Sequence, residues 1–145
     1  MSRAVPENEA PVIPEGFQKL ATNPGFALQI GPLYQKREGD DGYVRAFRVE
    51  PHHTNGMQNA HGGMLMAFAD MAFGHVISVR YQRWWISVRL ACDFLHPAPL
   101  GAWVEGNSEI LCREGDLFHL RGRIWVGDTV ILTGGGLFKA LKQRE

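Results

Sequence analysis

The hydrophobic pattern of the chain is dominated by one apolar run, from Met64 to Phe73, which follows a polar and turn-forming segment. Met, Leu, Ala and Phe occupy every position of this run except one, where Asp70 stands. A helix that is hydrophobic nearly all round is a buried one. The pattern therefore predicts a long central helix that the other elements surround.

Strand patterns precede this helix. Residues 26–36 and the alternating residues 43–49 are typical of two strands, joined by a loop at 39–42. A short helix is expected earlier, over residues 14–20, because Pro14 suits a first helical turn and the turn sequence Asn-Pro-Gly follows.

Four more strand-like runs follow the helix, and short glycine-containing turns separate the last three: 85–94, 102–112, 117–126 and 129–141. Strands joined by such turns form an antiparallel meander. One antiparallel sheet wrapped around the helix accounts most simply for this order of elements. We therefore predict an α+β fold in a single domain over residues 14–145, preceded by a flexible arm at 1–13.

Composition narrows the class of protein. The formal net charge is zero, which gives no indication of nucleic acid or an anionic membrane as a partner. The two cysteines form neither a metal-binding spacing nor a disulfide framework, and no apolar run reaches the length of a membrane span. The N-terminus lacks the apolar segment of a secretory signal. We expect a soluble, cytoplasmic protein.

Asp70 and the glycine pair before the helix are the first candidates for chemistry. A lone carboxylate in a buried helix must find partners or carry an unusual pKa. Gly62 and Gly63 leave backbone N–H groups free at the helix start, where the macrodipole favours negative charge. An acid and an anion-accepting helix terminus are parts of an acyl-transfer site. A hydrogen-bonded structural Asp and a simple turn are the alternative, and spacing alone leaves both open.

Other chemistries find less support. His52, His53 and His61 lie close in sequence but lack the paired spacing of a zinc site, so no metal is predicted. His75 stands five residues after Asp70, about 140° around the helix, so we expect it to be packed or capped rather than to form a dyad.

Glycine and serine motifs give equally little support to a phosphate-binding or serine-hydrolase function. Three glycines at 134–136 lack the Gly-Lys-Ser/Thr of a phosphate loop, and a bulge or close backbone approach is expected there. The chain has no Gly-x-Ser-x-Gly nucleophile elbow. The aromatic residues nearest the helix could line an acyl pocket or simply form core: Phe68, Phe73, Trp84 and Trp85.

The central segment contains a spaced motif: His53-Thr54-Asn55, then His61-Gly62-Gly63 after five residues, then Asp70-x-Ala-x-Gly after six more. This motif resembles that of the hotdog-fold acyl-CoA thioesterases. It is closest to the PaaI-like branch, typified by the thioesterase of the phenylacetyl-CoA pathway. Similar segments occur at Gly31-Pro32-Leu33, Ile86-Ser87-Val88 and Phe94-Leu95-His96-Pro97. The resemblance implies a hotdog fold for the domain and thioester hydrolysis without a cofactor.

Particular roles follow from that resemblance. It implies that Asp70 is the nucleophile or general base, and that the Gly62 N–H binds the thioester oxygen. It also implies that Asn55 positions water or substrate and that the Ser87 hydroxyl assists. Among the remaining motif positions, His61 is expected to shape the loop, and the substrate-contacting positions are Gly63 and Val88.

Helix geometry adds a prediction about assembly. Eight helical residues separate Gly62 from Asp70 by about 12 Å, too far for both to act on one carbonyl. A second copy, antiparallel about a twofold axis, would bring the two together. We therefore predict an acyl-CoA thioesterase that is a homodimer with shared active sites, or a tetramer of two such dimers. A hotdog-fold hydratase or dehydratase and a non-catalytic acyl-CoA binding module are the alternatives.

Overall fold

The computed structural model describes residues 12–22 and 24–142, so the predicted arm at 1–13 lies almost entirely outside the described residues. The elements occur in this order: β1 (Gln18–Lys19), α1 (Phe26–Ile30), β2 (Tyr34–Glu38), β3 (Gly42–Arg48), the 3-10 helix η1 (Pro51–His53), α2 (Gly62–Tyr81), β4 (Trp85–Phe94), β5 (Trp103–Glu114), β6 (Leu117–Val126) and β7 (Thr129–Ala140).

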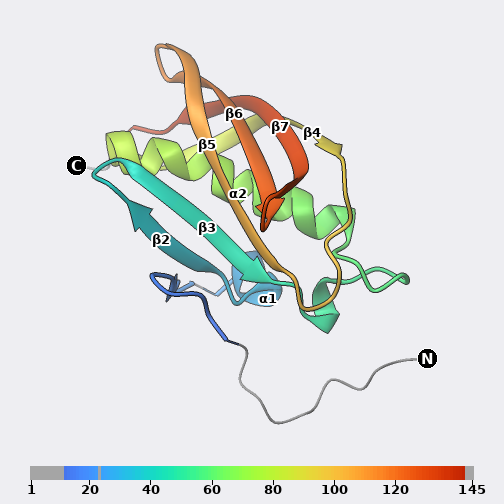
Figure 1. The fold of residues 1–145 in the computed structure, drawn as a ribbon. Helices are drawn as coiled ribbons and strands as arrows, with labels where there is room; N and C mark the ends of the chain where they lie inside the picture. Colours follow the sequence, from blue (N-terminus) through green and yellow to red (C-terminus); the bar gives the residue numbers. More distant parts are fainter. Residues whose placement is uncertain (1–11, 23, 143–145) are drawn as a thin grey trace.

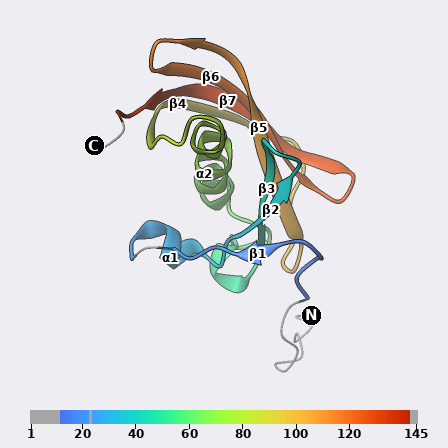
Figure 2. The same ribbon diagram turned by 90° about the vertical axis from the view of Figure 1, so that its left-hand side faces the viewer.

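The seven strands form one antiparallel sheet in the order β1-β2-β3-β5-β6-β7-β4. Figures 1 and 2 show this sheet curving around α2. β5, β6 and β7 form the predicted meander, and its turns contain Gly115 and Gly127 with φ of +59° and +57°. The predicted architecture, one antiparallel sheet wrapped around one long helix, is confirmed.

The core lies between α2 and the sheet. Five fully buried phenylalanines from these elements contribute most of its volume: Phe47, Phe68, Phe73, Phe118 and Phe138. Phe68 of α2 meets Phe47 of β3 edge to face, with ring centroids 4.9 Å apart. Burial of each such ring stabilises the fold by about 2–3 kcal/mol. Phe68 and Phe73 are therefore core residues, the simpler of the two interpretations that the sequence left open.

The central helix is buried on one side rather than all round, contrary to the sequence expectation. Asp70, Met71 and His75 are only partly buried. Because a single sheet covers one side of a helix, the apolar residues of the other side stay accessible. α2 also has the length and apolar composition of a membrane span, but half of its most apolar stretch is buried inside this fold. Its packing is that of a core helix.

The segments before β2 differ from the prediction. The helix expected over 14–20 is wrong, because Gln18 and Lys19 pair with β2 as a short strand. The strand expected over 26–36 begins instead with α1, which the Gly31-Pro32 sequence ends. Short segments of this kind take their conformation from tertiary pairing, which local propensity does not reveal.

The three glycines of β7 lie where neighbouring backbones come close. A Cβ on Gly136 would stand 1.9 Å from the carbonyl oxygen of Arg89, and one on Gly135 would stand 2.5 Å from that of Leu120. β4 is irregular at the same level, between Ser87 and Arg89. The close backbone approach expected at 134–136 is confirmed.

Candidate active site

The N-terminal end of α2 offers a free hydrogen-bond donor. His61 caps the helix with extended backbone, and its Nδ1 accepts from the Gly63 N–H at 2.8 Å. The His61 carbonyl accepts from Leu65 at 3.0 Å. In the described part of the chain, the Gly62 N–H has no acceptor. An unpaired N–H at a helix start can bind an anionic oxygen. His61 therefore lies where a loop-shaping residue was expected.

The loop that leads into α2 is built around Asn55. Its side-chain oxygen accepts from the N–H groups of Met57 at 3.0 Å and Asn59 at 3.2 Å. The Asn55 N–H donates to the Asn59 carbonyl at 2.9 Å. Because the oxygen is occupied by the loop, Nδ2 is the part of the amide that can meet a substrate or water. The side chain thus both shapes the loop and presents a donor.

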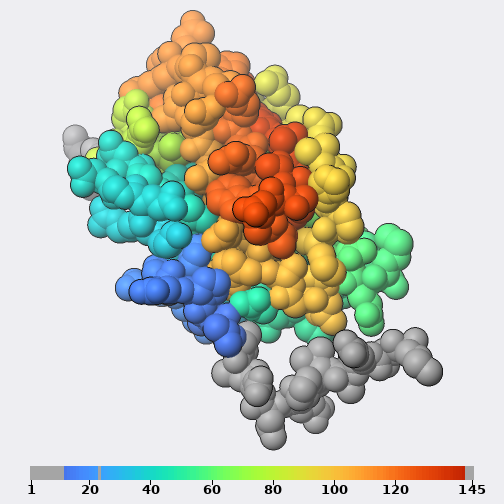
Figure 3. Space-filling model, viewed as in Figure 1, coloured from blue at the N-terminus to red at the C-terminus, as the bar shows by residue number. Residues whose placement is uncertain are grey.

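A cavity of about 360 Å³ joins this loop to the helix start. It is lined by the loop, the first turn of α2 and the end of β4: Asn55, Met57, Asn59, Ala60, Gly62, Leu65, Phe94, Leu95, His96 and Pro97. The Phe94 ring lies 3.6 Å from the position that a Cβ on Gly62 would take. Figure 3 shows the loop, in green, beside the yellow end of β4. A donor pair in a largely apolar cavity is typical of a small-molecule site.

The wall formed by Phe94 and Leu95 is what sequence reasoning missed. Phe94 is 50% exposed and Met57 is 77% exposed, although both are large and apolar. The segment Phe94-Leu95-His96-Pro97 already formed part of the resemblance. Nothing local in it indicated, however, that the ring of Phe94 lies on Gly62.

Asp70 is not part of this cavity. It lies two turns along α2, about 12 Å from Gly62 along the helix axis. It is half-buried, and no residue that the structure describes makes a hydrogen bond or ion pair with its carboxylate. The structure thus brings together Asn55 and Gly62 and leaves Asp70 apart from them.

Ser87 and Val88 lie on β4. Ser87 is exposed and pairs with Phe138, whereas Val88 falls at the irregularity of the strand and is 54% exposed. Gly63 is also exposed, but its N–H is occupied by His61. Of the two predicted substrate contacts, neither lines the cavity within one chain.

His75 faces away from Asp70 and contacts a different set of residues. Its Nδ1 lies 2.9 Å from Nη2 of Arg45, and its ring meets Tyr43 edge to face. Burial, aided by the positive charge of Arg45, lowers the pKa of His75 to about 4. His75 is therefore neutral and accepts a hydrogen bond from arginine, as expected of a packed residue.

The histidine pair of η1 is a structural element. His53 accepts from the Glu50 N–H at 3.0 Å, and its Nε2 lies 2.6 Å from the Ile30 carbonyl. Glu50, His52 and His53 bring potential metal ligands within 4.8 Å of one another. Both ring nitrogens of His53 are already hydrogen-bonded, however. In this structure the cluster therefore links η1 to the end of α1.

A larger cavity, of about 460 Å³, lies on β5, β6 and β7. Its polar lining includes Asn107, Thr133 and the ion pair of Arg121 with Glu109, which is 2.8 Å long and exposed. It contains none of the predicted site residues and no helix terminus. The smaller cavity, with its free N–H, is the one suited to a thioester carbonyl.

Comparison with known proteins assigns the class. Residues 57–133, more than half of the chain, match the thioesterase superfamily. The chain is also 26% identical over 128 residues to a candidate esterase of Pseudomonas aeruginosa, PA0474, covering 87% of this chain and 96% of that one. The chain therefore belongs to the thioesterase superfamily and is a thioester hydrolase.

Solved structures share the fold. Zebrafish thioesterase superfamily member 2 superposes with a TM-score of 0.73 at 21% identity, covering 83% of this chain and 88% of that one. Escherichia coli PaaI, from the phenylacetic acid degradation operon, gives 0.64 at 20%, covering 69% and 72%. BH2602 of Bacillus halodurans, solved with CoA, gives 0.67 at 18%, covering 80% and 76%. The hotdog fold that the sequence resemblance implied is confirmed.

Proposed function

We propose that the protein hydrolyses an acyl-CoA thioester at a site shared between two chains. Asn55 and Gly62 of one chain act with Asp70 and Ser87 of the other. One observation carries this proposal: the free Gly62 N–H and the Asn55 amide share a cavity that Asp70 does not reach. Solved relatives of the fold contain CoA, which supports the same ligand class here.

The chemistry assigns each group a task. The Gly62 N–H and Asn55 Nδ2 donate to the thioester oxygen, where negative charge develops as the carbonyl carbon becomes tetrahedral. Asp70 either takes a proton from an attacking water or attacks the carbon itself, forming an anhydride that water then opens. Either route adds water across the C–S bond, with hydroxyl on the carbon and a proton on the CoA sulfur.

The edge strand β4 supports the dimer. Within the described sheet, β4 pairs with β7 on one side only, and its other edge is unpaired. Large apolar side chains are exposed on or beside it, including Val88 and Trp84, which is 76% exposed. An apolar unpaired edge favours association with another strand. Antiparallel pairing of two β4 strands about a twofold axis would place the two α2 helices in opposite directions.

His75 disfavours the hydratase or dehydratase alternative. Such chemistry pairs an acid with a histidine, but His75 is neutral and hydrogen-bonded to Arg45 on the other side of α2. A non-catalytic binding module is the remaining alternative, and it predicts CoA binding without turnover. The cytoplasmic location and a tetrameric assembly remain predictions from the sequence.

Mixed dimers test the proposal. Purified wild-type protein should release free CoA from at least one acyl-CoA in a panel, with EDTA present, as measured with a thiol-reactive dye. Asp70→Ala and Gly62→Pro chains, each inactive alone, should regain up to one working site per dimer when differently tagged chains are co-expressed and the heterodimers isolated.

A matched heterodimer gives the opposite result. Wild type paired with an Asp70→Ala/Gly62→Pro chain contains no intact shared site, so it should be inactive. If each chain held its own complete site, this second heterodimer would keep half of the activity and the first would have none. An active monomer in sedimentation would also exclude the shared site.

A further inference from the structure

Gly74, the last residue of the Asp70-x-Ala-x-Gly motif, lies under the ring of Trp85. A Cβ at this position would stand 2.4 Å from two atoms of the indole and 2.5 Å from a third. Real Cβ atoms do not approach other atoms so closely, so only glycine permits this contact. Glycine in a helix interior costs about 1 kcal/mol relative to alanine. Glycine at position 74 therefore lowers the stability of the helix but allows the indole to pack against it.

A second aromatic ring packs against a glycine at the other end of β4, where Phe94 covers Gly62. Trp85 begins β4 and Phe94 ends it, while Gly74 follows Gly62 along α2. The two contacts therefore show that β4 runs back along α2 in the opposite direction. Asp70 and Ser87 both lie between these contacts.

The spacing sets Ser87 level with Asp70. Asp70 precedes Gly74 by one helical turn, which is about 6 Å along the axis and on nearly the same side of the helix. Ser87 follows Trp85 by two residues, about 6.6 Å along the strand and on the same face of the sheet. The strand partners of Trp85 and Ser87 are Ala140 and Phe138, both buried. Both displacements run toward the Phe94 end, so the two side chains come to the same level.

This turn of α2 is also fixed from the other side. Tyr43 donates its hydroxyl to the Ala72 carbonyl. Ser108 donates to the Phe73 carbonyl at 2.6 Å. The Trp85 ring in turn packs against Phe138 at a centroid distance of 5.4 Å. The helix and the indole are thus each braced, and neither can shift freely to admit a larger residue at position 74.

We propose that the Gly74–Trp85 contact is a positioning device that sets the distance between α2 and β4 and so aligns Asp70 with Ser87. Trp85 and Gly74 act through that alignment and touch no reacting atom. Ser87 can then donate its hydroxyl to the Asp70 carboxylate or to the water beside it. The kinetic consequence rests on the proposed thioesterase site, whereas the alignment itself does not.

Gly74→Ala tests the contact in the intact dimer. The added methyl forces the indole outward, so kcat should fall about 10-fold or more while KM stays within about threefold. Gly74→Ala/Trp85→Phe makes room for the methyl and should return kcat to within about threefold of wild type, a non-additive rescue.

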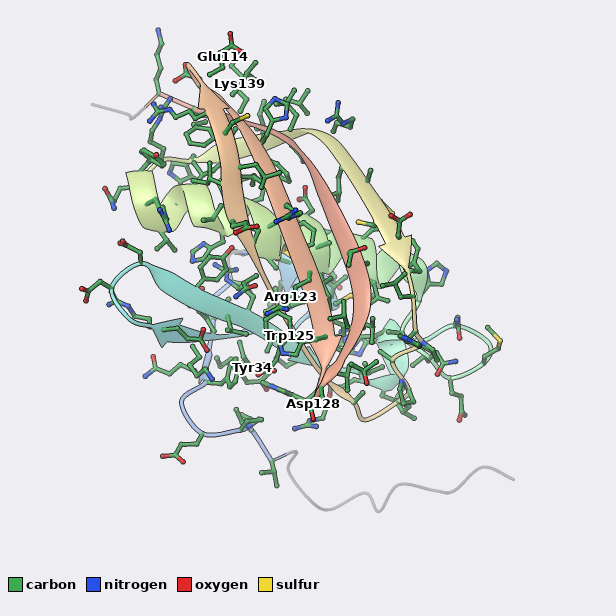
Figure 4. The ribbon with its side chains drawn as sticks, turned by 45° about the horizontal axis from the view of Figure 1, so that its top comes forward. Tyr34, Glu114, Arg123, Trp125, Asp128 and Lys139 are labelled. Atoms are coloured by element: carbon green, nitrogen blue, oxygen red, sulfur yellow. The ribbon has the colours of Figure 1, made fainter. Side chains whose placement is uncertain are left out.

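Trp125 supplies the control for loss of a tryptophan. It lies on β6 beside Arg123, as Figure 4 shows, and donates to Glu105 rather than to any residue of α2. Gly74→Ala/Trp125→Phe should therefore show no rescue. Wild-type kcat in Gly74→Ala, or equal rescue by Trp125→Phe, would overturn the positioning role.

A second readout does not need activity. Asp70→Cys/Ser87→Cys, in a chain with Cys92→Ala and Cys112→Ser, should form a disulfide within one chain on mild oxidation. Non-reducing electrophoresis separates this product from a link between chains. Adding Gly74→Ala should lower its yield several-fold, and adding Trp85→Phe as well should restore it.

The outcomes separate the two proposals. Absence of the intrachain link in the parent, or an unchanged yield with Gly74→Ala, refutes the alignment. If the links behave as expected but no acyl-CoA is hydrolysed by the wild type, the alignment stands and the thioesterase proposal fails.

Discussion

The first turn of α2 and the turn around Asp70 belong to one helix but present different chemical groups. The first turn lines a cavity together with the neighbouring Asn55, and its Gly62 N–H has no acceptor among the described residues. The turn around Asp70 presents a carboxylate on a partly exposed surface, next to the edge strand. Because a thioester needs both at one carbonyl, the proposed function requires each chain to supply two half-sites that a second copy completes.

The two turns also differ in how they are fixed. Side-chain hydrogen bonds between near neighbours shape the first: His61 bonds Gly63, and Asn55 bonds Met57 and Asn59. Backbone bonds with Ala98 and Leu100 also tie its loop to the segment after β4. The turn after Asp70 is held by long-range partners instead, with Tyr43 bonded 29 residues away and Ser108 bonded 35 residues away. The difference teaches that the donor geometry depends on the loop and the segment after β4, whereas the turn after Asp70 depends on side chains of β3 and β5.

The strongest test of the comparison removes the carboxylate. Asp70→Ala should lower kcat by about 10²-fold or more, because the base or nucleophile is lost while the cavity remains. Binding of a non-hydrolysable acyl-CoA analogue, measured by calorimetry, should stay within about threefold. Asp93→Ala, an exposed carboxylate on the same edge strand, is the matched control. Undiminished turnover in Asp70→Ala would refute the role of this half-site.

Removing the donor is the corresponding test of the first turn. Gly62→Pro should lower kcat by about 10²-fold, the scale of one oxyanion donor. Proline is well tolerated at the first helical position, so the variant should fold. Gly62→Ala keeps the N–H, and its methyl would meet Phe94 at an ordinary 3.6 Å, so it should be nearly silent. An active, folded Gly62→Pro enzyme, checked by circular dichroism, would exclude the donor role.

Two substitutions of Asn55 distinguish its role in shaping the loop from its role as a hydrogen-bond donor. Asn55→Asp keeps the oxygen that accepts from Met57 and Asn59 but loses the Nδ2 donor. We expect kcat/KM to fall about 10-fold with little change in Tm. Asn55→Ala loses both functions, so it should lower Tm as well. A fully active Asn55→Asp enzyme would show that the amide only shapes the loop.

The smallest expected effect concerns the far side of the Asp70 turn. The pKa of His75, lowered to about 4 by burial and by Arg45, lies below the ordinary 6.5 of an unfolded histidine. The unfolded chain therefore binds the extra proton first. The stabilisation is complete above about pH 6.5 and is lost as pH falls toward 4. With a discount for solvent screening, about 1–2 kcal/mol should be lost.

His75→Gln keeps an acceptor for Arg45 and removes the titration. Urea unfolding at pH 7 and pH 4.5 should show a smaller loss of stability in this variant than in wild type. Its kcat at pH 7 should match wild type, since His75 lies away from Asp70. A large loss of turnover would place His75 in the active site and would revive the acid–histidine alternative.

Local pattern predicted much of this architecture. The apolar run predicted α2, the alternating residues 43–49 predicted β3, and four strand-like runs predicted β4 to β7, whose meander followed from its turns. The segment before β2 was not predictable in the same way. Residues 18–19 and 26–30 are too short for periodicity to decide, and pairing with β2 or packing near η1 determines their conformation.

The candidate site also has features that the local sequence predicted and features that it did not. The order Asn55, Gly62, Asp70 along the chain, and the 1.5 Å rise of a helix, already required that donor and carboxylate lie too far apart for one carbonyl. These conclusions depend only on neighbours in sequence and on helix geometry.

Tertiary structure alone decided what surrounds those residues. Phe94 on Gly62, Trp85 on Gly74 and Tyr43 on Ala72 join positions far apart in the chain. Their contacts arise because the sheet closes around α2 and places β4 at one of its two edges. No local pattern encodes such a contact, since it is the packing of distant apolar surfaces that selects which side chains meet. The sequence by itself thus determined the candidate groups of the proposed site, and the fold determined the walls, the spacing and the open edge around them.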